Sequence, residues 1–194
     1  ISSAASDVYK RQIVGGFEKV YELSKDFRNE GIDRSHNPEF TMLELYVAHE
    51  TPDFLMNMIE DMMRAISQEL FGSDKIEYQG VTIDFTGHFQ RLTMEESVLK
   101  YNPELDKEKV RDAGYLRSFA EGIDIAVEND AGAGKILFEI FEKTVEHQLQ
   151  QPTYITSYPR EISPLSRAND DDPWIVDRFE FFIMGRELAN GFQE

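Results

Sequence analysis

The chain contains no cysteine, has no long hydrophobic run and carries few positive charges for its size. Without cysteine it can form neither a disulfide nor a thiolate metal site, and this composition is compatible with a reducing compartment. No apolar stretch approaches the ~20 residues that an α-helix needs to cross a bilayer, so we expect no membrane partner.

Acidic residues dominate the charge balance. The 20 Lys and Arg residues are outnumbered by 37 Asp and Glu residues, which gives a formal net charge of −17. Because phosphate groups repel an acidic surface, we do not expect the chain to bind nucleic acid non-specifically. No dense Lys/Arg cluster is present in the sequence, so any nucleic-acid contact must use a local basic patch or another part of the protein.

The 194 residues, 41% hydrophobic and 29% charged, are enough for one domain with its own core. Residues 1–12 stand apart, because Ser2 to Gln12 resembles an in-frame translation of a sequencing-library adapter and no initiator Met precedes it. We therefore treat residues 1–12 as an unstructured artefact, with a functional tail as the alternative. We expect residues 13–194 to be one partial domain, so that the reading frame is a fragment.

Start and stop signals, together with the spacing of apolar residues, predict several helices. Thr51 is a suitable N-cap before Pro52, and Gly72 is a suitable stop. Thr93 and Glu96 have the spacing of a capping box. The expected helices cover residues 52–71, 93–101, 107–121 and 135–149, and we expect the helix at 107–121 to be exposed.

Alternating apolar and polar residues predict strands in the remaining segments. In the stretch 178–184, alternation places Arg178 and Glu180 on one face and Phe179 on the other. Residues 159–173 have no such pattern and are expected to form a long loop. Loops of that length inside a compact domain usually have a functional role. The expected strands and hairpins lie at residues 20–23, 27–46, 75–85 around a Gln79-Gly80 turn, 153–157 and 178–184.

The stretch Ala131-Gly132-Ala133-Gly134-Lys135 superficially suggests a phosphate-binding loop. That motif requires Gly-x4-Gly-Lys followed by Ser or Thr, and Ile136 stands where the hydroxyl should be. We therefore reject a phosphate loop and interpret the glycines as the lead-in to a helix.

Residues 27–46 organise the rest of the chain. They are expected to form two strands joined by a polar loop from Gly31 to Pro38, whose residue types suit turns. If the strands pair, one face carries Arg28, Glu30, Glu44 and Tyr46, that is, a guanidinium, two carboxylates and a phenol. Spacing alone favours the ordinary solvent-exposed side of a sheet for such a face.

The order of residues in this hairpin resembles the class II aminoacyl-tRNA synthetases. Motif 2 of the family is matched by Phe27-Arg28-Asn29-Glu30, His36-Asn37-Pro38-Glu39-Phe40-Thr41 and Glu44-Leu45-Tyr46, and this version is similar to the lysyl-tRNA synthetases in particular. The pattern from Arg178 to Glu194 is similar to the same enzymes. The resemblance implies an α+β fold, with an antiparallel β-sheet flanked by helices.

The resemblance also implies roles in binding ATP. Arg28 is expected to be the catalytic arginine that bridges the α-phosphate and the substrate carboxylate. The planar guanidinium of arginine can bind two oxygens at once, so it suits this role better than the ammonium of lysine. Glu30 is expected near the adenine amino group, and His36 and Asn37 on the loop over the nucleotide. Phe40 is expected to stack on adenine, although core packing is the simpler interpretation from the sequence alone.

A second set of roles concerns Mg²⁺ and lysine. By resemblance, Glu180 and Glu187 hold Mg²⁺ against the ATP phosphates, an arrangement that Mg²⁺ favours. They are seven residues apart, so they need a turn between them, which Gly185 can provide; without the resemblance they are simply glutamates on a wet strand. The expected lysine-binding residues are Glu44, Tyr46, Asn190, Phe192 and Glu194.

The implied activity is that of a lysine–tRNA ligase: ATP-dependent formation of lysyl-adenylate and transfer to tRNA(Lys), in a cytoplasmic homodimer that uses Mg²⁺. We see neither the family's motif 1 nor its motif 3 nor an anticodon-binding domain, so we expect this fragment to be inactive alone. Ser35 also departs from the Arg of some relatives. The alternatives are a lysine ligase that modifies a translation elongation factor, which tends to have Trp in place of Leu45, and a non-catalytic regulatory module.

Overall fold

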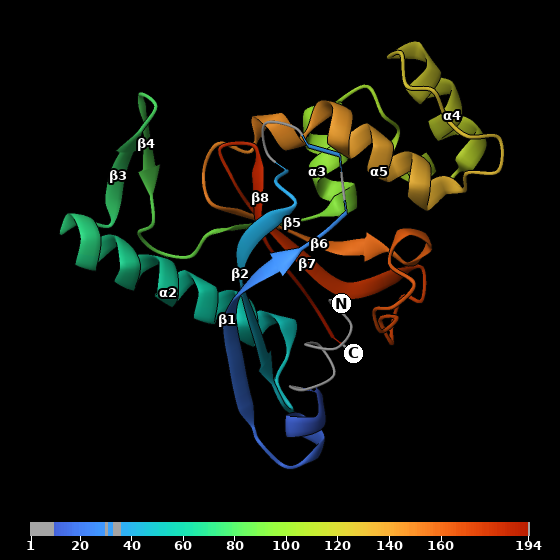
Figure 1. Cartoon of the computed structure of the whole chain (residues 1–194). Helices are drawn as coiled ribbons and strands as arrows, with labels where there is room; N and C mark the ends of the chain where they lie inside the picture. The colour runs from blue at the N-terminus through green and yellow to red at the C-terminus, as the bar shows by residue number, and fades with distance from the viewer. Residues whose placement is uncertain (1–9, 30, 33–35, 194) are drawn as a thin grey trace. The chain divides into compact units, whose positions relative to one another are not determined.

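The computed structural model describes residues 10–29, 31–32 and 36–193 (Figure 1). The chain divides into two compact units, Ile1–Glu50 and Thr51–Glu194. That residues 13–194 are one partial domain stays a prediction. Residues 10–14 form a helical turn, in which the Gly15 amide donates to the Arg11 carbonyl. Residues 10–12, part of the segment that the sequence analysis expected to be unstructured, lie in this turn. The rest of that expectation, for residues 1–9, lies outside the described residues.

The first unit is built around an antiparallel hairpin of β1 (Lys19–Phe27) and β2 (Glu39–Val47). The register continues beyond β1, because the Arg28 amide donates to the Pro38 carbonyl at 2.9 Å. This pairing confirms the second strand expected within residues 27–46 and the strand expected at residues 20–23. The first strand of the expected pair was misplaced, because β1 ends at Phe27 and only the Arg28–Pro38 hydrogen bond continues the pairing. The two faces of the hairpin differ. One, called the polar face below, carries Glu22, Asp26 and Glu44. The other carries exposed apolar side chains such as Tyr21, Leu23 and Leu43.

The second unit begins with α2 (Pro52–Phe71), whose ends are those that the sequence predicts. The Thr51 hydroxyl accepts a hydrogen bond from the Phe54 amide, and Pro52 occupies the first turn, where its missing N–H costs nothing. Gly72 ends the helix in the left-handed conformation at φ 66°, which glycine adopts without steric cost. Within the part of the chain that the structure describes, no helix is long and apolar enough to span a membrane.

The central sheet has the order β5-β6-β7-β8 (Figure 1). Its strands are β5 (Gln90–Thr93), β6 (Thr153–Pro159), β7 (Ile175–Ile183) and β8 (Arg186–Phe192). The pairs β6–β7 and β7–β8 are antiparallel, whereas β5 lies parallel to β6 after a long helical connection. The α+β class with a mainly antiparallel sheet is thus confirmed, and β5 and β8 are strands that the sequence analysis missed.

Alternation along the sheet strands produces two hydrophobic cores. One core joins Phe182 and Ile155 to α3 (Met94–Tyr101), α4 (Ala113–Gly122) and α5 (Ala133–Thr144). The other joins Phe179, Phe181 and Tyr154 to α2 and to the hairpin of β3 (Lys75–Tyr78) and β4 (Val81–Asp84). Both faces of this sheet are therefore covered, which explains why β7 carries buried apolar side chains on both of its faces.

The segment 107–121, expected to be one exposed helix, is divided in two. A short 3-10 turn, η1 (Lys107–Lys109), is followed by a new start at Asp112, whose carboxylate accepts from the Tyr115 amide at 2.8 Å and caps α4. The expectation of an exposed helix was also wrong, because Leu116 and Ala120 are fully buried in the core. The helix expected over 135–149 begins at Ala133 and ends at Thr144, before a further 3-10 turn, η2 (Glu146–Gln148).

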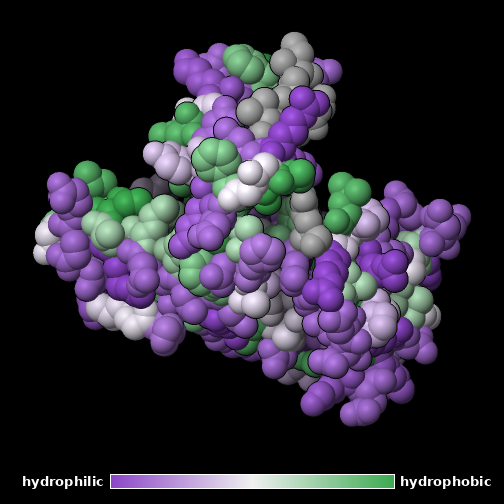
Figure 2. All heavy atoms as spheres, turned by 90° about the horizontal axis from the view of Figure 1, so that it is seen from below, coloured by the Kyte–Doolittle hydropathy of each residue, from purple (hydrophilic) through white to green (hydrophobic). Residues whose placement is uncertain are grey.

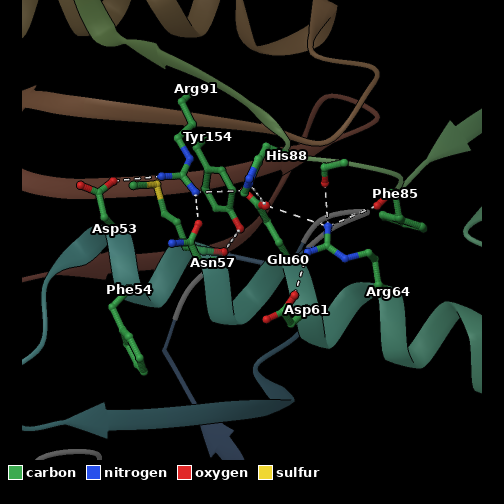
Figure 3. Close-up of polar contacts among 12 residues, drawn as sticks. Asp53, Phe54, Asn57, Glu60, Asp61, Arg64, Phe85, His88, Arg91 and Tyr154 are labelled. Atoms are coloured by element: carbon green, nitrogen blue, oxygen red, sulfur yellow. Dashed lines mark hydrogen bonds and ion pairs between the residues drawn. The ribbon is translucent and has the colours of Figure 1, made fainter.

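A buried acid anchors α2 beneath the sheet (Figure 3). The Glu60 carboxylate is fully buried. Its Oε1 lies 3.0 Å from Arg91 Nη2, and its Oε2 lies 3.0 Å from His88 Nδ1. Arg64 lies 3.9 Å away. The two guanidiniums also lie over aromatic rings, Arg91 over Tyr154 and Arg64 over Phe89. Because a buried carboxylate must be paired, this network fixes α2 to β5 and to the loop before it.

The N-terminus of α5 is occupied by the chain's own carboxylate. Glu161, in the 3-10 turn η3 (Arg160–Ile162), accepts hydrogen bonds from the Gly132 amide at 2.8 Å and the Lys135 amide at 3.2 Å. The positive end of the helix is thereby satisfied without a phosphate. This geometry confirms the rejection of a phosphate-binding loop, and it gives the glycines a packing role.

We expect opposite effects from alanine at two helical glycines. A Cβ at Gly134 would lie 2.7 Å from Pro159 Cβ, whereas one at Gly122 meets nothing within 4 Å. Gly134→Ala should therefore lower the free energy of unfolding by about 1–3 kcal/mol. Gly122→Ala should raise it by up to about 1 kcal/mol, because alanine loses less entropy in a helix. Urea unfolding of both variants checks the pair, and a stabilising Gly134→Ala would contradict the packing described.

The surface is mostly hydrophilic, with scattered apolar groups (Figure 2). This agrees with the large excess of acidic residues. The C-terminal end of α2 is an exception, since Ile66, Leu70 and Phe71 are exposed there.

Candidate active site

The polar face of the β1–β2 hairpin holds one cation beside an aromatic ring. The Arg28 guanidinium lies 5.3 Å from the centre of the Phe40 ring, which is half-buried. Further along the same face, Glu22 and Glu44 are directly opposite each other in the register. Burial, and then the charges of Asp26 and Glu22, raise the pKa of Glu44, while Arg28 opposes this effect.

Like charges directly opposite each other destabilise a sheet, so the Glu22–Glu44 pair has a cost that a bound cation would offset. The sequence analysis missed Glu22. Its signal was available in the alternation of β1, but only the register shows that it faces Glu44. Tyr46 lies on the same face, half-buried, as expected from its spacing.

Several expected ATP-binding residues sit on the hairpin loop. Asn37 donates its side-chain amide to the Glu39 carbonyl at 2.7 Å, which ties it to the start of β2, and His36 is exposed. The expected site residues Glu30 and Glu194, and the departure at Ser35, lie outside the described residues.

In the second unit, Glu180 lies in the middle of β7 and is only 5% exposed. Tyr158 donates its hydroxyl to Glu180 Oε2 at 2.7 Å, and Arg178 donates to Glu180 Oε1 at 2.5 Å. Burial, followed by the charge of Glu180, raises the pKa of Tyr158 well above its usual value, so the phenol stays a donor. Glu180 is thus not the wet-strand glutamate of the simpler interpretation.

The turn between β7 and β8 is a tight one. Met184 and Gly185 both have positive φ, 54° and 65°, as a type I′ turn requires at its two central positions. A Cβ on Gly185 would also lie 3.1 Å from the Cα of His147. The expectation that Gly185 supplies the turn is confirmed.

A register shift in β8 brings the expected residues to one face. Glu187 pairs with Phe182, and after the irregularity Asn190 pairs with Glu180 and Phe192 with Arg178. Residues 187 and 190 would point to opposite faces of a regular strand, so the bulge is what places both beside Glu180. Gly191, between Asn190 and Phe192, faces the other way and is covered by the Phe179 ring.

The helix and turn facing this site add negative charge. Burial and neighbouring carboxylates, Glu180 among them, raise the pKa values of Glu142 and Glu146. In the same helix, Glu139 Oε2 is enclosed and accepts no hydrogen bond from the residues described. The site therefore collects more negative charge than Arg178 balances.

This donor set fits Mg²⁺ shared with a phosphate. Glu180 and Glu187 are two carboxylates on one face, and Mg²⁺ is commonly held by one or two carboxylates plus substrate phosphates. Among the described residues, no group of three or more His, Cys, Asp or Glu is placed to hold a metal, so an all-protein cage is absent there.

The sequence matches the family model described as tRNA synthetases class II (D, K and N) over residues 3–194. Curated relatives include the lysine–tRNA ligase of Thioalkalivibrio sulfidiphilus, 49% identical over 191 residues, which are 98% of this chain and 38% of the relative. The lysine–tRNA ligase of Teredinibacter turnerae is 50% identical over 196 residues, covering 98% of this chain and 39% of the relative. The chain therefore spans less than two fifths of these relatives, and it belongs to the class II (D, K and N) tRNA synthetases.

Proposed function

We propose that this chain is a catalytic segment of a lysine–tRNA ligase, which activates lysine with ATP and transfers it to tRNA(Lys). The observation that carries the proposal is the polar face of the hairpin, where a guanidinium beside an aromatic ring is followed by an opposed pair of carboxylates. The end of this face with Arg28 and Phe40 suits an anionic nucleotide, and the end with Glu22 and Glu44 suits a cationic side chain. The names of the relatives support the same activity.

In this proposal Arg28 is the catalytic residue of adenylate formation. The reaction gathers negative charge on the α-phosphate, and a positioned guanidinium stabilises that charge through two parallel hydrogen bonds. Phe40 supplies a flat apolar surface for adenine, and its place under Arg28 keeps the ring and the cation together. Glu30, His36 and Asn37 are the further nucleotide contacts.

Glu180 and Glu187 are the residues that would hold Mg²⁺. When bound, the metal supplies positive charge that neutralises the ATP phosphates. The chain contributes two carboxylates fixed by the sheet register, one of them oriented by Tyr158 and Arg178.

The proposed lysine pocket is acidic. A buried ammonium must be paired, and the pKa of Glu44 is raised first by burial and then by the neighbouring carboxylates of Asp26 and Glu22. Binding the lysine ammonium would relieve this repulsion and favour the ionised form of Glu44. The other proposed lysine contacts are Tyr46, Asn190, Phe192 and Glu194. The partners are ATP, lysine and tRNA(Lys), and we propose a cytoplasmic homodimer.

The acceptor of the activated lysine tests this function. The complete protein that carries this segment should transfer labelled lysine to tRNA(Lys) when ATP and Mg²⁺ are present, and should leave a translation elongation factor unlabelled. The label that precipitates in acid is counted with and without ribonuclease. Ribonuclease removes label carried by tRNA(Lys) and leaves label carried by a protein, so the treatment separates the two acceptors. Label that survives ribonuclease and follows the elongation factor would contradict the proposal and favour a protein-modifying ligase.

A further inference from the structure

The structure gives Glu180 two partners that the sequence analysis did not single out. We propose that Tyr158 and Arg178 are positioning residues that orient the Glu180 carboxylate for Mg²⁺. This inference rests on the proposed function, because it concerns the metal site of that reaction. It goes further by assigning roles to a buried tyrosine and an arginine.

The first observation is a β-bulge that re-aims Tyr158. In a regular strand, Tyr154 and Tyr158 would point to the same face. The register of β6 shifts between Thr156 and Tyr158, and Ser157, between them, has φ of 56°. Tyr154 therefore packs in the core on the α2 side, while Tyr158 packs in the core on the α5 side, where its hydroxyl reaches Glu180. Bulges commonly redirect a side chain in this way next to active sites.

The second observation is that each of the three guanidinium nitrogens of Arg178 donates a hydrogen bond. Besides the bond to Glu180, Nε donates to Asn190 Oδ1 at 3.1 Å and Nη1 donates to Ser163 Oγ at 2.7 Å. The guanidinium also lies 4.6 Å from the centre of the Tyr158 ring. One side chain thus joins β7, β8 and the loop after β6 around a single carboxylate.

Together the two partners fix the direction in which Glu180 presents its oxygens. Each oxygen of an ionised carboxylate has about two acceptor sites, so one donor on each leaves the other free. Oε1 is taken once by Arg178 and Oε2 once by Tyr158. Partners of this kind tune metal ligands, and their loss typically weakens metal binding by about 10- to 100-fold.

Two tyrosines of β6 provide a matched comparison. Tyr154 and Tyr158 are both fully buried, and each hydroxyl donates one hydrogen bond, but Tyr154 donates to the Met56 carbonyl on the other side of the sheet. Tyr158→Phe and Tyr154→Phe therefore remove the same group from equally buried rings. Only the first removes a partner of Glu180.

The test measures Mn²⁺ affinity of the complete protein by electron paramagnetic resonance, in the presence of a non-hydrolysable ATP analogue. It also measures the Mg²⁺ concentration that gives half-maximal lysine-dependent ATP–pyrophosphate exchange. Tyr158→Phe should weaken Mn²⁺ binding and raise the Mg²⁺ requirement, each about tenfold. Arg178→Lys should do the same, because one ammonium cannot replace the fork. Tyr154→Phe should leave both values unchanged.

The inference is overturned if Tyr158→Phe and Arg178→Lys keep the wild-type Mn²⁺ affinity, or if Tyr154→Phe shifts it equally. Failure of the proposed function gives a different result. A wild-type protein without lysine-dependent exchange would contradict that function, whereas the Mn²⁺ titration of the variants would still decide the roles of Tyr158 and Arg178.

Discussion

Glu60→Ala is expected to lower the free energy of unfolding of this chain by about 3–5 kcal/mol, the usual cost of breaking a buried ion pair. The Glu60 carboxylate is fully buried and is the common partner of Arg91 and His88 (Figure 3). Its removal leaves Arg91, itself only 29% exposed, without its buried partner. Urea denaturation followed by circular dichroism measures the change.

The neighbouring Asp61 provides the control for this loss. It also pairs with an arginine, Arg64, at 2.7 Å, but its own side chain is 79% exposed. Asp61→Ala should therefore change the stability by less than about 1 kcal/mol, as expected for a solvent-exposed pair. If the two variants unfolded at the same urea concentration, the buried network would not be the anchor of α2.

Arg28→Ala should lower kcat/KM for lysine-dependent ATP–pyrophosphate exchange by about 100- to 1,000-fold in the complete protein, as expected for one positioned group that stabilises transition-state charge. Arg28→Lys should recover only part of the activity, because an ammonium lacks the fork that binds two oxygens in parallel. Steady-state exchange at saturating Mg²⁺ gives the values. The prediction depends on the proposed function and on the place of Arg28 beside Phe40.

Lys25, which lies in β1 three residues before Arg28, provides a control. It lies on the opposite face of the hairpin, where it pairs with Glu39 at the exposed surface. Lys25→Ala removes the same charge from the hairpin and should leave the exchange rate unchanged. Equal losses in Lys25→Ala and Arg28→Ala would show that overall charge, and not the polar face, supports the reaction.

Much of the fold could be predicted because its signals are local. The cap at Thr51, the stop at Gly72 and the capping box at Thr93 each depend on residues within a turn of the helix end, and the structure confirms all three. The hairpin at Gln79-Gly80 is confirmed for the same reason, since both residues have positive φ. Periodicity then assigned the faces of β7 correctly.

Other features could not be predicted because they depend on pairing between distant segments. The bulges in β6 and β8 change which residues share a face, and they leave no mark in the alternation of apolar residues. The parallel pairing of β5 and the Glu60 network join residues about thirty or more positions apart. The break at Asp112 had a local signal, an Asp at a suitable N-cap, which the sequence analysis did not use.

The central claim is that residues of the hairpin and residues of β7 and β8 serve one reaction, the activation of lysine. Amino-acid-dependent ATP–pyrophosphate exchange tests it most directly, with the complete protein and with its Arg28→Ala and Glu180→Ala variants, using lysine, aspartate and asparagine in turn. The account predicts exchange with lysine alone, and its loss in both variants. Exchange that depends on aspartate or asparagine, or that persists with lysine in either variant, would contradict it.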